Sequence, residues 1–99
     1  MITHHVLFWL KPDTSDDQKQ AFREGLQTLE KINSVKSFHV GTPSVIERAV
    51  VDRSYTFSLL LFFEHLEAHD AYQVDELHKA FLERFRSLFE KVVIYDAES

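Results

Sequence analysis

Tyr72 and His78 have the side chains and the spacing for acid–base chemistry, since they stand on either side of a predicted helix break at Asp75. At about 100° per residue, His78 falls on the apolar side of its helix and should point inward. A histidine in a pocket can act as general base or acid near neutral pH. A phenol can donate a hydrogen bond to a substrate carbonyl and stabilise an enolate. The structural alternatives are a histidine bonded to a backbone carbonyl and a tyrosine that only packs its ring.

The remaining histidines do not predict a metal site. His4 and His5 are adjacent on a predicted strand and point to opposite faces, so they cannot bind one ion together. His65 and His69 have the i, i+4 spacing of helical metal ligands. No third ligand accompanies them and the HExxH order is absent. We therefore predict a solvated helix face, no metal and no cofactor.

Several other kinds of chemistry are excluded by composition. The chain has no cysteine, which rules out disulfides, thiolate metal sites and cysteine nucleophiles. Its two glycines, Gly25 and Gly41, cannot form a glycine-rich phosphate loop, and no Ser/His/Asp triad follows from spacing. The pairs Glu47-Arg48 and Asp52-Arg53 could anchor a carboxylate or phosphate, but surface ion pairs or dimer contacts are favoured.

The charge balance argues against nucleic acid and membrane partners. The 99 residues carry a formal net charge of -5, and no Lys/Arg cluster follows a predicted face. The longest apolar run, residues 59–63, is too short to span a bilayer. The first residues lack the basic region and the small-residue cleavage site of a signal peptide. We expect a single domain over residues 1–99 and a cytoplasmic protein.

The hydrophobic pattern predicts strands that alternate with helices. Predicted strands cover residues 2–11, 35–42, 54–64 and 91–96, and predicted helices cover 15–32 and, with a break, 65–74 and 75–88. Thr14 or Ser15 suits the start of the first helix, and Asp75 suits the start of the last. The last helix should bury Leu77, Phe81, Phe85 and Leu88. Gly25 lies beside the buried stripe of the first helix, which suggests a close approach to the sheet.

The order β-α-β-β-α-β predicts an α+β, ferredoxin-like fold. The first and third strands should lie at the centre of an antiparallel four-stranded sheet, with both helical segments on one face. These two strands are apolar on both sides, and an uncovered apolar sheet face is an interaction surface. We therefore predict a homodimer in which two sheets pack face to face. Val45, Ile46, Val50 and Val51, in the long segment 42–54, should pack somewhere, on a second subunit as one possibility.

The chain resembles the stress-responsive A/B-barrel (Dabb) family over essentially its whole length. The resemblance rests on residues 4–8 (HHVLF), the strand 54–64, Ala71-Tyr72, His78 and residues 94–96 (IYD). It implies a dimeric α/β barrel of ferredoxin-like subunits. A plant relative, olivetolic acid cyclase, performs an aldol condensation without cofactor, and its catalytic tyrosine and histidine match Tyr72 and His78.

The same resemblance implies pocket residues and shows two departures. A pocket histidine of the plant cyclase matches His4. A second one is replaced here by Phe57, and the usual His-Pro-x-His turn is Asp75-Glu76-Leu77-His78, which keeps only its last histidine. We expect His4, Phe57 and Phe81 to line a ligand pocket.

Two function classes follow. The first is a dimer that binds a small apolar or phenolic molecule between sheet and helices. The alternative is a cofactor-free aldol-type cyclase or isomerase that uses His78 as base and Tyr72 as electrophilic partner. A cofactor-free or haem-dependent monooxygenase is a weaker third option, and a purely structural role in stress tolerance is also open.

Overall fold

The computed structural model describes residues 1–99 and confirms the predicted ferredoxin-like order of elements. The strands are β1 (Ile2–Leu10), β2 (Ser37–Gly41), β3 (Phe57–Phe63) and β4 (Phe89–Glu98). The helices are α1 (Asp16–Thr28), α2 (Leu66–Gln73) and α3 (Glu76–Phe85), with 3₁₀ turns at Leu29–Lys31 and Arg86–Leu88. The sheet is antiparallel in the order β2-β3-β1-β4, so the two most apolar strands are central.

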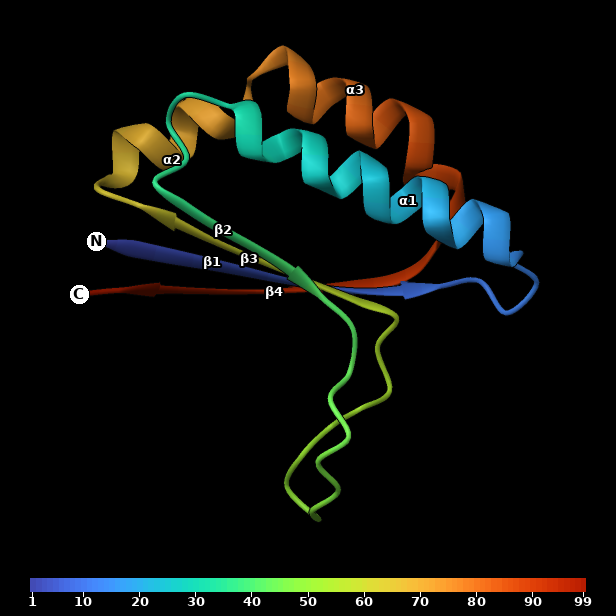
Figure 1. Cartoon of the computed structure of the whole chain (residues 1–99). Helices are drawn as coiled ribbons and strands as arrows, with labels where there is room; N and C mark the ends of the chain where they lie inside the picture. The colour runs from blue at the N-terminus through green and yellow to red at the C-terminus, as the bar shows by residue number, and fades with distance from the viewer.

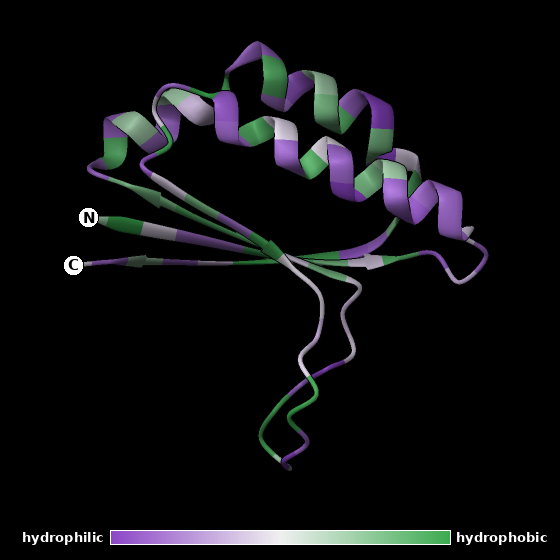
Figure 2. Cartoon of the chain, in the orientation of Figure 1, coloured by the Kyte–Doolittle hydropathy of each residue, from purple (hydrophilic) through white to green (hydrophobic).

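The three helices cover one face of the sheet, while the segment between β2 and β3 extends away from the other face (Figure 1). Buried and half-buried residues alternate strictly along β1 and β3. This period of two sends one set of side chains to the helices and the other to the open face. The outward surfaces of the helices are mostly hydrophilic (Figure 2). No helix has the length and apolar character needed to cross a membrane.

Local capping explains where the helices begin. Ser15 caps α1 in a capping box with Gln18, in which each side chain accepts a hydrogen bond from the other residue's backbone N–H. Asp75 caps α3, because its carboxylate accepts a hydrogen bond of 2.8 Å from the backbone N–H of Leu77. The helix break predicted at Asp75 is therefore confirmed.

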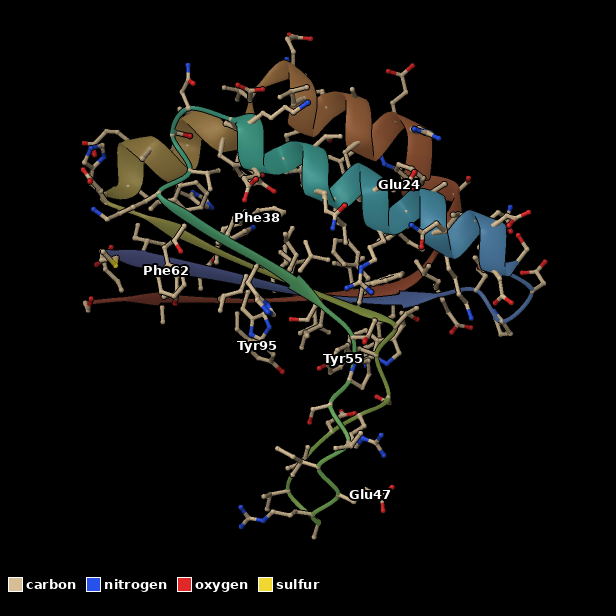
Figure 3. The ribbon with its side chains drawn as sticks, viewed as in Figure 1. Glu24, Phe38, Glu47, Tyr55, Phe62 and Tyr95 are labelled. Carbon is tan, nitrogen blue, oxygen red and sulfur yellow. The ribbon has the colours of Figure 1, made fainter.

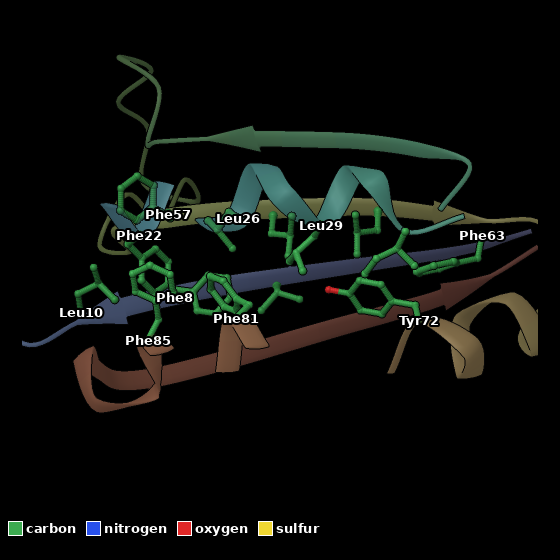
Figure 4. Close-up of a cluster of buried hydrophobic side chains, with 14 of the residues drawn as sticks. Phe8, Leu10, Phe22, Leu26, Leu29, Phe57, Phe63, Tyr72, Phe81 and Phe85 are labelled. Carbon is green, nitrogen blue, oxygen red and sulfur yellow. The ribbon is translucent and has the colours of Figure 1, made fainter. Parts of the chain in front are cut away.

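Aromatic rings dominate one half of the core, around Phe22 (Figure 4). The Phe22 ring lies 5.2 to 5.4 Å, between centroids, from those of Phe8, Phe57, Phe81 and Phe85. Most of these contacts are edge-to-face, the arrangement that ring quadrupoles favour. The rings join α1 and α3 to the two central strands.

Gly25 permits a close approach, but to α3 and not to the sheet as predicted. A Cβ at this position would lie 2.3 Å from Cε2 of Phe85. The reason is that α1 and α3 pack side by side on the sheet, so the small residue faces the neighbouring helix.

Two further expectations differ from the structure. Leu77 is exposed, because it lies in the first turn of α3, away from the buried stripe that begins at Phe81. β4 runs to Glu98, well past the predicted end, because its backbone pairs with β1 as far as Ile2. The apolar residues of the segment between β2 and β3 are exposed on the single chain, so packing on a second subunit stays a prediction for them; these are Val45, Ile46, Val50 and Val51.

Candidate functional site

A cavity of about 180 Å³ lies between the sheet and the helices. Side chains from β1, β3, β4, α2 and α3 form most of its wall. Thirteen residues line it, ten of them hydrophobic: His4, Val6, Phe8, Leu29, Leu59, Tyr72, Gln73, His78, Phe81, Leu82, Phe89, Val92 and Ile94. The polar groups of the wall are therefore few, and they belong to His4, Tyr72, Gln73 and His78.

His78 enters the cavity from the first turn of α3. Its Nδ1 lies 3.1 Å from the backbone carbonyl oxygen of Gln73. A carbonyl only accepts hydrogen bonds, so this contact assigns the proton to Nδ1 and leaves a lone pair on Nε2. Burial lowers the pKa of His78, opposed by the bond to Gln73. His78 is thus a neutral base at neutral pH.

Tyr72 packs its ring against that of His78, with centroids 4.7 Å apart. Only 1% of Tyr72 is exposed, and burial raises the pKa of its phenol. The hydroxyl therefore stays protonated and can donate a hydrogen bond. In Figure 4 it points from the α2 end of the core toward the middle of the sheet.

His4 lies on the other side of Tyr72, with ring centroids 5.9 Å apart. Its Nδ1 is 2.5 Å from Oδ1 of Asp96 on the paired strand β4. Burial lowers the pKa of His4, while the hydrogen bond and the charge of Asp96 oppose that shift. The carboxylate holds the proton on Nδ1, as in an Asp–His pair, so Nε2 again carries the lone pair.

The three side chains form a group with complementary proton roles. Two imidazoles carry Nε2 lone pairs, and the phenol between them is a hydrogen-bond donor. Such a group can accept a proton from a bound molecule and hydrogen-bond an oxygen on it. No step of this kind needs a metal or an organic cofactor.

The family model for the stress responsive A/B barrel domain matches residues 2–99. The chain belongs to this family. No curated protein sequence matches this A/B barrel chain. Among solved structures, it is similar to a Dabb family protein with a ferredoxin-like fold from Mesorhizobium loti, with a TM-score of 0.79 and 24% identity over 99% of this chain and 95% of that one.

Two further solved structures share the fold of this A/B barrel. One is a dimeric ferredoxin-like protein of unknown function from Thermobifida fusca, with a TM-score of 0.82 and 20% identity over 99% of this chain and 90% of that one. The other is the hydroxynitrile lyase of Passiflora edulis, with a TM-score of 0.71 and 23% identity over 97% and 90%. The fold is thus found in a dimer and in an enzyme.

Four of the five residues singled out in the sequence of this A/B barrel chain meet at the cavity: His4, Tyr72, His78 and Phe81. Phe57 does not line it. Its ring stacks on Phe22 in the aromatic half of the core, because Phe57 lies two residues along the same face of β3 from Leu59, which is the residue that lines the cavity.

Sequence reasoning missed the surroundings of His4. His69 is half-buried, with its ring centroid 5.1 Å from that of His4, so the solvated face expected for it is wrong. His65 is exposed as predicted, and its Nδ1 accepts a hydrogen bond from the backbone N–H of Ala68 as the cap of α2. Asp96 reaches His4 only because the register of β1 and β4 places the two residues opposite each other. The sequence offers no local signal for that register.

Two further groups of residues lie outside the cavity, on the open face of the sheet and in the segment between β2 and β3. Tyr55 and Tyr95 lie on the side of the sheet away from the helices (Figure 3). In the segment between β2 and β3, the Arg53 guanidinium lies 3.0 Å from the Glu47 carboxylate, which confirms a surface ion pair there. Neither tyrosine lines the cavity.

Proposed function

We propose that this A/B barrel protein is a homodimer that binds a small, mainly apolar molecule bearing a phenol or carbonyl oxygen. The observation that carries the proposal is the cavity with its ten hydrophobic residues and its His4–Tyr72–His78 group. Small-molecule sites are typically apolar with a few placed polar groups. A cavity of about 150 Å³ accepts benzene, so a volume of about 180 Å³ suits a ligand with one ring.

The polar groups define what the ligand must present. The Tyr72 hydroxyl can donate a hydrogen bond, which requires an oxygen acceptor on the ligand. The Nε2 lone pairs of His4 and His78 require a donor, such as a phenolic hydroxyl. Hydrocarbons would leave these polar atoms unpaired, and an unpaired buried polar group costs about 1–3 kcal/mol.

A second candidate is cofactor-free acid–base catalysis on the same molecule. Both imidazoles are held as neutral bases, and a lyase shares the fold. The Nε2 of His78 would remove a proton from the carbon beside a carbonyl, while Tyr72 hydrogen-bonds the enolate oxygen. In an aldol-type step, the enolate carbon then bonds to a second carbonyl carbon, and the resulting alkoxide takes the proton back from His78.

The homodimer rests on the open face of the sheet. Its partly exposed apolar side chains are Leu7, Trp9, Leu60, Phe62 and Val93, joined by the exposed Tyr95. Apolar patches of this kind usually mark interfaces. Three structural neighbours are described as dimeric proteins, which supports the same assembly here.

Binding is tested by thermal unfolding with matched one-ring probes, such as p-cresol and toluene. A ligand at tenfold excess over its Kd adds about 1.4 kcal/mol, several degrees for a domain of this size. We expect the phenol to stabilise more than the hydrocarbon, and Tyr72→Phe to reduce that difference while Tyr55→Phe keeps it. Equal shifts for both probes, or an unchanged Tyr72→Phe variant, would refute the proposed recognition.

Catalysis is tested by exchange of hydrogen for deuterium at the carbon beside the carbonyl of a bound aryl ketone, followed by NMR. His78→Gln should slow protein-catalysed exchange at least about 100-fold, while His39→Gln, on the exposed face of β2, should not. Binding without any exchange would leave the protein a binding module and remove the second candidate.

A further inference from the structure

Three potential metal ligands from three different elements converge beside the cavity. They are His4 on β1, His69 on α2 and Asp96 on β4. One ligand atom of each lies within 4.8 Å of those of the other two. The residues are distant in sequence, and only the packing of α2 against the β1–β4 pair brings them together.

This cluster borders a second, open cavity of about 150 Å³ at the end of the sheet. His69, Asp96 and Glu98 line it, together with Ile2, Leu66 and Ala97. No lysine or arginine is part of that wall, whereas two carboxylates are. An ion can thus reach the cluster from outside, and the local charge favours a cation.

The orientation of His69 suits metal binding. Its Nδ1 lies 3.2 Å from Oδ1 of Asp70, and its Nε2 lies 3.3 Å from the amide nitrogen of Gln73. The carboxylate holds the proton on Nδ1 and the amide donates to Nε2, so the lone pair is on Nε2 and a metal ion would bind there in place of the Gln73 amide. A carboxylate that orients a ligating imidazole is the usual outer shell of metal-bound histidine.

We propose that His4, His69 and Asp96 form a site for a divalent first-row transition metal of the zinc class. Two imidazoles and one carboxylate favour zinc, cobalt or nickel over calcium and magnesium, which prefer all-oxygen ligands. Three protein ligands leave one coordination position for water or for Glu98.

Small movements of two side chains complete the geometry. Ligands about 2.0–2.1 Å from a tetrahedral zinc ion lie about 3.4 Å apart. The His69 and Asp96 side chains are 18% and 51% exposed, so both can move. His69 would turn toward His4, and Asp96, whose Oδ1 is 2.5 Å from Nδ1 of His4, would draw back as the ion replaces the proton between these two atoms. The site goes beyond the proposed ligand pocket, and its test requires no organic ligand.

The test is a titration of the chelator-treated full-length protein with Co²⁺, followed by its visible absorption, and with Zn²⁺ by calorimetry. We expect one ion per chain. His69→Ala and the nearly isosteric Asp96→Asn should each weaken binding by at least about tenfold, the loss seen even for outer-shell changes. Circular dichroism establishes that both variants fold.

The matched control is His65→Ser, on the same helix. Serine retains the capping of α2 but removes an exposed imidazole four residues before His69. His65→Ser should bind metal as the wild type does. If it weakens binding as much as His69→Ala does, the ion sits on the helix surface between His65 and His69, and the proposed site is wrong. Absence of stoichiometric binding would overturn it equally.

Discussion

At the scale of single residues, the hydrogen-bond partner decides what each imidazole can do. His78 donates from Nδ1 to a neutral backbone carbonyl, whereas His4 donates to the carboxylate of Asp96. A carboxylate stabilises an imidazolium far better than a carbonyl does. His4 is therefore the better place to hold a proton in transit, and His78 is the better neutral base.

Three partly or fully buried histidines should make the protein less stable in acid. Burial lowers the pKa of His4, His5 and His78 from 6.5 in the unfolded chain. Below about pH 6.5 the unfolded state then binds more protons than the folded one, so stability falls as pH falls toward the folded pKa values. Each histidine contributes at most about 1.4 kcal/mol per pH unit.

Urea unfolding at about pH 7.5 and about pH 5.5 measures this loss, across the range in which histidine titrates. His78→Gln should reduce the difference between the two values, while the exposed His39→Gln should not. Asp52 and Glu64, whose pKa values are lowered by Ser54 and Lys36, act only at lower pH. A wild type equally stable at both values would contradict the assignment of neutral buried imidazoles.

At the scale of elements, the site depends on the break between α2 and α3. The break puts Tyr72 near the end of one helix and His78 in the first turn of the next. It also leaves the Gln73 carbonyl without a helical partner, and His78 donates to it. The cap at Asp75 thus positions the acid–base pair as well as starting α3.

The contact between α1 and α3 gives a prediction for Gly25. Gly25→Ala should gain about 1 kcal/mol of helix propensity but cost more, because overpacking a core typically costs about 1–3 kcal/mol. The added Cβ would lie 2.3 Å from a carbon of the buried Phe85 ring. We expect a net loss in the free energy of unfolding, measured with urea.

The same substitution in a Phe85→Leu background is the control. Leucine removes the ring atoms that the new methyl group would meet, so Gly25→Ala should there be neutral or stabilising. Such coupling between residues in contact is what a double-mutant cycle measures. A stabilised Gly25→Ala single variant would show that the close approach does not constrain this position.

At the scale of the whole molecule, the chain is a slab with one covered and one open face. Its extents are 36 × 32 × 17 Å, and all three helices lie on one side of the sheet. The apolar residues of the open face and of the projecting segment have few partners within the chain. The proposed dimer would supply those partners.

A charge at the centre of the open face should dissociate that dimer. Leu60 lies on the central strand β3 and points to the open face, and a carboxylate taken out of water into an apolar interface there is strongly unfavourable. Leu60→Glu should therefore sediment as an 11.6 kDa monomer, and the wild type at twice that mass. Val74→Glu, at an exposed position after α2, is the matched control and should remain dimeric. A wild type that already sediments at 11.6 kDa would exclude the dimer.

The sequence by itself determined the order of elements, the faces of the central strands and the cap at Asp75, and it narrowed the first cap to Thr14 or Ser15. These features depend on local periodicity and on residues a few positions apart, such as Asp75 with Leu77. The inward position of His78 follows from the same helical period. The family pattern added Tyr72 and His4 to the pocket.

Only the tertiary structure decided which side chains meet. It placed Phe57 in the aromatic core, turned Gly25 toward Phe85, and joined His4 to Asp96 and His69. Each of these contacts spans many residues and depends on strand register or helix packing, which local patterns do not encode. The lone pair on Nε2 of His4 and the proposed metal site beside it are consequences of that packing.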